Sequence, residues 1–247
     1  MNTNNEIINE LQDFMFNEEN IKSYLSIRNE YLNNKQNEDS NKKINKQSKK
    51  SSMYFPNQQD SLFWCYYIIA NGDVQYEMLQ NKNFLLAKQM KIELVDKIRK
   101  FKHIVKMYKF DTLTAIESNL ANDNTINSKT FCTLCAIENI NIIYIRKNTY
   151  FELLLNDTDI IYIVKEVEGQ SKYVSKYGFE VATKEMLKSI DESLYKIESI
   201  NKPIKCESAY KVQDLIDICC KLGIELNNND GKKKTKKEMY ELIIQYF

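Results

Sequence analysis

A change of periodicity near residue 140 constrains the fold of this chain more than any other feature of its sequence. Before it, apolar residues recur at helical spacing. After it, runs rich in Ile, Tyr, Val and Phe occupy residues 141–146, 150–154 and 160–164, a composition that favours strands. The turns at Lys147-Asn148 and Asn156-Asp157-Thr158 are short, and parallel strands need a longer crossover. We therefore predict an antiparallel β-meander, with a fourth strand at residues 172–175.

The first half of the body is expected to be helical, because its apolar residues repeat at helical spacing. Asp60 or Ser61 can cap a first helix that Gly72 ends. Thr183 can cap a late helix that runs to residue 198. Helices followed by an antiparallel meander indicate the α+β class. The early helices are expected at residues 62–70, 83–108 (as one helix or a broken pair), 112–120 and 128–138.

Four regions follow one another along the chain. Residues 1–33 show apolar residues at helical spacing and are predicted to be a helical segment. Residues 34–53 are almost all polar, so they bury too little apolar surface to order the backbone, and we predict a disordered linker. Residues 54–200 form the α+β body. Residues 201–247, which begin at Asn201-Lys202-Pro203, form a small C-terminal helical hairpin.

The composition limits the classes of function that the chain can have. A net charge of +1 over 247 residues means that any nucleic-acid-binding surface must be local. We expect an intracellular protein with reduced thiols and no membrane partner, because no apolar run suits a signal peptide or a bilayer span. Cys132 and Cys135 have the spacing of zinc ligands, but the chain has one His and no second such pair. We therefore predict no metal and no other cofactor.

A glutamine stands six residues before a cysteine in the segment Gln-Asp-Ser-Leu-Phe-Trp-Cys at residues 59–65. This spacing resembles that of papain-like cysteine peptidases. The resemblance implies that Cys65 is the nucleophile, that Gln59 helps to form an oxyanion hole, and that His103, the only histidine, is the base. However, His103 lies on a basic helix and not on a late strand, and a cap at residue 60 or 61 places Cys65 inside its helix. A degenerate relative of these enzymes, or a buried core thiol, is the other interpretation.

Residues 208–247 are predicted to form two helices joined by a lysine-rich turn. Gly223 can end the first helix in the left-handed conformation. Thr235 and Glu238 have the spacing of a capping box, which begins the second helix. The positive end of that helix would then be surrounded by lysines, a favourable place for a phosphate. The candidate contacts are Lys232, Lys233, Lys234, Thr235, Lys236 and Lys237. The apolar sets that would face each other are Leu215, Ile218, Leu222 and Ile224, and Met239, Leu242 and Ile243.

This hairpin resembles the SAP motif, a helix–loop–helix module that binds DNA. The matching residues are Leu215, Cys219, Gly223-Ile224, Gly231-Lys232, Glu238 and Leu242-Ile243. The resemblance implies contact between the lysines and the backbone of duplex DNA. The loop at residues 225–230 is longer than the family's, and Gln245 and Tyr246 stand where a basic residue is common. A packing hairpin, or one that docks on an acidic protein, is the alternative.

Residues 97–109 form a second basic element with no acidic residue. A basic helix face can lie along phosphates, and it can equally be the solvated face of an amphipathic helix. Both interpretations stay open at this point. Its cations are Lys97, Arg99, Lys100, Lys102, Lys106 and Lys109.

The whole chain resembles proteins of nucleocytoplasmic large DNA viruses, through residues 61–69, Tyr76-Glu77-Met78-Leu79 and the lysine-rich tail. The resemblance implies a place in the host cytoplasm, the viral factory or the virion. Our hypothesis is a non-enzymatic viral protein that binds the backbone of duplex DNA through the hairpin, with a viral or acidic protein as a further partner. The alternatives are a papain-like cysteine protease or deubiquitinase-like thiol hydrolase that uses Cys65, and a structural virion or scaffold protein.

Overall fold

The computed structural model describes residues 53–80, 82–167, 176–227 and 231–247. The predicted helical segment at residues 1–33, the predicted linker except for Met53, and the predicted strand at residues 172–175 lie outside the described residues. The described part is an α+β structure that contains a five-stranded sheet.

The sheet is mixed, so the predicted antiparallel meander is wrong. Its strands stand in the order β4-β3-β1-β2-β5. β1 pairs with β2, and β3 with β4, in antiparallel fashion, whereas β1 pairs with β3, and β2 with β5, in parallel. The bounds are Ile142–Arg146 for β1, Thr149–Leu153 for β2, Tyr162–Val167 for β3, Lys176–Val181 for β4 and Tyr195–Ile197 for β5.

The path from β2 to β3 explains the difference. The connection does not turn back beside β2 but carries β3 to the far edge of β1. The buried side chain of Asn141, directly before β1, forms hydrogen bonds with the loop between β2 and β3. Its Oδ1 accepts hydrogen bonds from the N–H groups of Leu155, at 2.7 Å, and Asn156, at 3.2 Å. Its Nδ2 donates to the carbonyl oxygen of Asn156 at 3.0 Å. These contacts hold the loop that leads to β3 against the start of β1.

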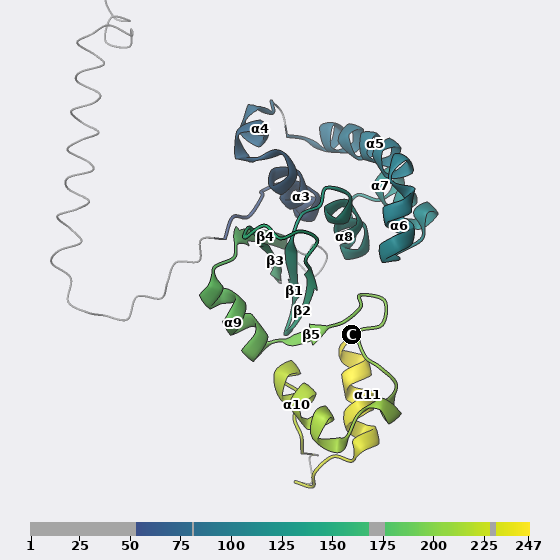
Figure 1. Cartoon of the computed structure of the whole chain (residues 1–247), viewed down its shortest axis with the longest axis vertical. Helices are drawn as coiled ribbons and strands as arrows, with labels where there is room; N and C mark the ends of the chain where they lie inside the picture. The colour runs from purple at the N-terminus through teal and green to yellow at the C-terminus, as the bar shows by residue number, and fades with distance from the viewer. Residues whose placement is uncertain (1–52, 81, 168–175, 228–230) are drawn as a thin grey trace, which may run out of the picture. The chain divides into compact units, whose positions relative to one another are not determined.

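A strand also stands where the sequence predicted the end of a helix. The helix predicted to run to residue 198 is α9, which ends at Ser193 and is followed by β5 (Figure 1). The predicted helix at residues 83–108 is a broken pair, α5 and α6, that meets at Phe101. The helices before the sheet are α3 (Ser61–Asn71), α4 (Asp73–Met78), α5 (Phe84–Lys100), α6 (Lys102–Tyr108), α7 (Leu113–Asn122) and α8 (Ser128–Ile137). Between β4 and β5 stands α9 (Lys184–Ser193), and β5 is followed by a 3-10 turn (Glu207–Ala209), α10 (Val212–Leu222) and α11 (Lys236–Tyr246).

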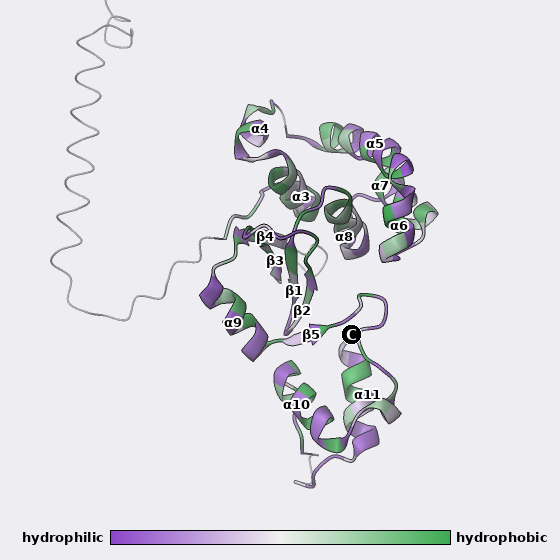
Figure 2. Ribbon diagram, in the orientation of Figure 1, coloured by the Kyte–Doolittle hydropathy of each residue, from purple (hydrophilic) through white to green (hydrophobic). Residues whose placement is uncertain are grey.

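Alternation along the strands gives the sheet two apolar faces. Tyr144 and Phe151 belong to the larger core, which the helices α3 to α8 share. Ile143 and Ile145, which alternate with them in β1, pack against α9. Figure 2 shows hydrophobic colour along α3 and the central strands, and mixed colour along α5 and α6. The sheet thus lies between a thick helical layer and a single helix.

A buried ion pair joins the helices of the thick layer. Asp60 caps α3 by accepting from the N–H of Phe63 at 3.2 Å. Its other oxygen accepts from the N–H of Ile126 at 3.0 Å and pairs with Lys91 Nζ at 2.6 Å. Lys91 Nζ also donates to the carbonyl oxygen of Asn124 at 3.0 Å. The carboxylate therefore connects the start of α3, the middle of α5 and the loop before α8.

Candidate nucleic-acid interface

The predicted C-terminal hairpin is present as α10 and α11, and it has an apolar core of its own. Ile224 and Leu226 pack against this core from the joining loop. Burial of one stripe on each helix is what holds such short helices together, since helices of this length are marginal in isolation. The buried residues are Leu215, Ile218, Cys219, Leu222, Met239 and Ile243.

Hydrogen bonds hold both ends of the loop between the two helices. Gly223 takes the left-handed conformation (φ 75°, ψ 26°) that ends α10, as predicted. The N–H of Ile224 then donates to the carbonyl oxygen of Cys219 at 2.9 Å. On the other side, Lys234 Nζ donates to the carbonyl oxygens of Glu225, at 2.6 Å, and Asn227, at 2.7 Å. Lys234 is therefore a loop-closing residue, a role that the sequence motif did not indicate.

The predicted capping box at the start of α11 is confirmed. Thr235 Oγ1 accepts from the N–H of Glu238 at 3.3 Å, and Glu238 Oε2 accepts from the N–H of Thr235 at 2.6 Å. Two amide groups that a helix start would leave unpaired are thereby satisfied. The Glu238 carboxylate also offsets part of the positive helix end.

Most of the lysines around this helix start are exposed. Lys232, Lys233 and Lys237 are exposed and Lys236 is half-buried. Lys237 has a partner in Glu241, at 3.9 Å, a separation at which an exposed pair contributes little. Lys232, Lys233 and Lys236 form no ion pair with another residue in the described part of the chain. The start of α11 therefore carries several cations that are available to an anionic ligand.

The hairpin is fixed to the body at the turn between β1 and β2. The N–H of Asn148 donates to the Tyr246 hydroxyl at 3.0 Å, and its side-chain Nδ2 donates to the carbonyl oxygen of Leu222 at 3.0 Å. Lys221 Nζ donates to the carbonyl oxygen of Asp191 at 2.9 Å. Sequence reasoning missed these contacts, because the partners lie far apart in the chain.

The three residues predicted for thiol catalysis lie in different surroundings. Cys65 is fully buried in α3, one turn from its start, and its thiol donates to the carbonyl oxygen of Tyr177 at 3.7 Å. Gln59 is exposed, and His103 is exposed on α6 with its ring 6.1 Å from that of Phe101. Within the described residues no hydrogen bond joins any two of Cys65, Gln59 and His103. Cys65 is therefore buried and, within the described residues, has no hydrogen bond to the imidazole that the resemblance assigned as its base.

The electrostatics of Cys65 agree with this geometry. Burial, with a smaller contribution from Asp60, raises the pKa of the Cys65 thiol well above its usual range. Burial also raises the pKa of both Cys132 and Cys135, which lie inside α8. A thiol that stays protonated is neither a nucleophile nor a metal ligand. Among the described residues there is no group of three or more His, Cys, Asp or Glu side chains that could hold a metal ion.

No helix in the described residues is long and apolar enough to span a membrane. No family model matches the chain, and neither the curated proteins nor the solved structures compared with it give a match. The resemblances to viral proteins, to the SAP motif and to papain-like peptidases therefore stay predictions.

Proposed function

We propose that this protein binds the phosphate backbone of duplex DNA through the start of α11. The observation that carries the proposal is the group of lysines there, of which Lys232, Lys233 and Lys236 form no ion pair within the described residues. Because Glu238 already occupies the helix end, the lysine side chains and not the backbone amides would supply most of the attraction. The resemblance to the SAP motif favours duplex DNA as the source of the phosphates.

Such an interface has definite expected properties. Phosphate contacts carry no sequence information, so binding should tolerate changes in base sequence. Each neutralised phosphate releases counterions, and the logarithm of the affinity falls with the logarithm of salt concentration with a slope of about −0.9 per contact. Four lysine contacts would thus weaken binding about 100-fold between about 50 and 200 mM salt.

The test is a titration of a fluorescent duplex with the full chain and with a variant in which Lys232, Lys233, Lys236 and Lys237 are all Gln. These side chains are largely exposed, so the variant should fold. We expect the variant to bind at least about 100-fold more weakly at about 50 mM salt. The control is Lys165→Gln with Lys184→Gln and Lys188→Gln, which removes three exposed lysines outside the hairpin. Equal binding by the hairpin variant and the wild type would defeat the proposal.

A further inference from the structure

The second basic element, at residues 97–109, divides into paired and unpaired cations in the structure. Lys97 pairs with Glu138, and Arg99 Nε contacts Glu117 at 2.8 Å, so these two cations hold α5 to neighbouring helices. Lys100, Lys102, Lys106 and Lys109 form no ion pair with another described residue. All four are exposed. The structure thus resolves which part of the element is free to bind.

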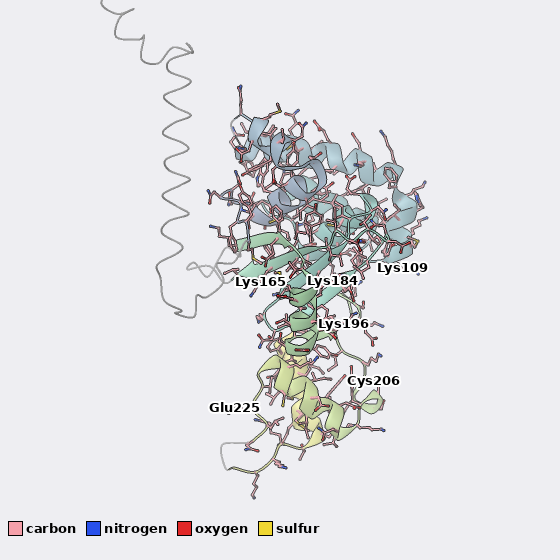
Figure 3. The ribbon with its side chains drawn as sticks, turned by 60° about the vertical axis from the view of Figure 1, so that its left-hand side comes forward. Lys109, Lys165, Lys184, Lys196, Cys206 and Glu225 are labelled. Carbon is pink, nitrogen blue, oxygen red and sulfur yellow. The ribbon has the colours of Figure 1, made fainter. Side chains whose placement is uncertain are left out.

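Three of these lysines share one groove. Lys102, Lys106 and Lys109 line it together with Val105, Phe110 and Leu113. Lys109 ends α6 in the left-handed conformation (φ 53°, ψ 38°). Its carbonyl oxygen accepts a hydrogen bond from Asn201 Nδ2 at 2.9 Å, which holds this end of α6 in place. In Figure 3, Lys109 lies well apart from Lys165 and Lys184.

The groove has a clear excess of positive charge. Asp111 also lines it, but this carboxylate faces Lys129 Nζ at 3.7 Å and accepts from the N–H of Thr112 at 2.8 Å. Lys102 and Lys106 stand at i and i+4 on α6, where like charges repel and weaken a helix. A polyanion in the groove would remove that repulsion.

We propose that Lys102, Lys106 and Lys109 form a second contact with a phosphate backbone. The identity of the ligand rests on the proposed function, because the hairpin supplies the argument for duplex DNA. The three lysines extend over about 10 Å of helix axis, and the phosphates of one DNA strand advance about 3.4 Å per nucleotide along the duplex axis. Where α6 lies along the duplex axis, the three lysines therefore span about three phosphates of one strand, with one ammonium group for each.

The test compares the salt dependence of duplex binding by four full-length proteins. These are the wild type, the groove variant (Lys102, Lys106 and Lys109 all to Gln), the hairpin variant described above, and a control (Lys165, Lys184 and Lys188 all to Gln). The groove variant should show a slope shallower by about 2 to 3, because three contacts of about 0.9 each are lost. The control should keep the wild-type slope. A fifth protein, in which Arg replaces the three groove lysines, should also keep the wild-type slope, since the charge remains.

The outcomes separate the two proposals. If the hairpin variant has a reduced slope and the groove variant does not, the groove proposal falls and the proposed function stands. If only the groove variant has a reduced slope, the groove binds phosphate and the hairpin does not. If both keep the wild-type slope, both proposals fall. The same proteins are also titrated with polyglutamate, as a probe for acidic proteins. If the groove variant loses binding to polyglutamate but keeps the wild-type slope with DNA, the groove binds an acidic protein and the proposal is overturned.

Discussion

The hydroxyl of Tyr246, in the last turn of α11, accepts a hydrogen bond of 3.0 Å from the N–H of Asn148, in the turn between β1 and β2. The side chain of Asn148 also reaches the carbonyl oxygen of Leu222 at the end of α10. Lys147 lies over the Tyr246 ring, with its Nζ 5.3 Å from the ring centre. One turn of the sheet therefore holds both helices of the hairpin.

Asn148→Ala should loosen the hairpin without unfolding the body. The substitution removes the side-chain hydrogen bond to Leu222, and the expected loss is about 1 kcal/mol. Amide hydrogen exchange should accelerate in α10 and α11 and stay unchanged in β1 and β3. Asn122→Ala is the control, because in the described part of the chain its side-chain amide bonds to Ser118 within its own helix, α7. Unchanged exchange in α10 and α11 would show that this turn does not hold the hairpin.

Lys233 and Lys234 are neighbours with different expected roles. Lys234→Met should lower the thermal midpoint of unfolding, because the carbonyl groups of Glu225 and Asn227 lose their donor. Lys233→Gln should leave the midpoint unchanged and make the salt slope of DNA binding shallower by about 0.9. Calorimetry and a salt titration of both variants measure the two effects. A lower midpoint for Lys233→Gln, with an unchanged midpoint for Lys234→Met, would contradict the roles that we assign.

The six cysteines should differ sharply toward a thiol reagent. Cys206 and Cys220 are exposed, whereas Cys65, Cys132, Cys135 and Cys219 are buried. A hydrogen bond with Ser208 lowers the pKa of the Cys206 thiol, so its thiolate should form at a lower pH than an ordinary thiol's. The labelling rate of Cys206 should therefore rise with pH and reach its midpoint below the pH typical of free cysteine. Mass spectrometry of the labelled peptides measures each site, and rapid labelling of Cys65 in the native protein would contradict its buried position.

Lys91→Met should destabilise the protein more than Asn148→Ala or Lys234→Met. It leaves the buried Asp60 carboxylate, which lies 2.6 Å from Lys91 Nζ, without its cation. Breaking such a pair by removing one partner costs about 3 to 5 kcal/mol. Urea unfolding measures the change, and Lys88→Met serves as the control because it lies one turn earlier in α5 and is less buried. Equal stability of the two variants would show that the ion pair contributes little.

Local signals in the sequence predicted local structure well. Thr235 and Glu238 form the capping box, Gly223 is left-handed, and Asp60 caps α3, because each of these depends only on residues within one or two turns. The apolar stripes of the hairpin were also readable, since helical spacing places them on one face.

Structural features that depend on contacts between residues far apart in the chain could not be predicted. The loop that leads to β3 is held against the start of β1 by hydrogen bonds between Asn141 and residues some fifteen positions away. The strand β5 has only three residues, so its sequence carries almost no strand signal, and its pairing with β2 defines it. The paired state of Lys97 and Arg99 depends on acids in other helices. The sequence therefore could not separate the structural cations from the unpaired ones.

The salt dependence of duplex binding by the wild-type chain tests the central claim most directly. Four lysines at the start of α11 and three in the groove, at about 0.9 each, predict a slope of about −6, and the four lysines of the hairpin alone would give a slope of about −4. Two duplexes of unrelated sequence should bind with equal affinity. A slope near zero, or no binding at about 50 mM salt, would contradict the claim that this protein binds a phosphate backbone.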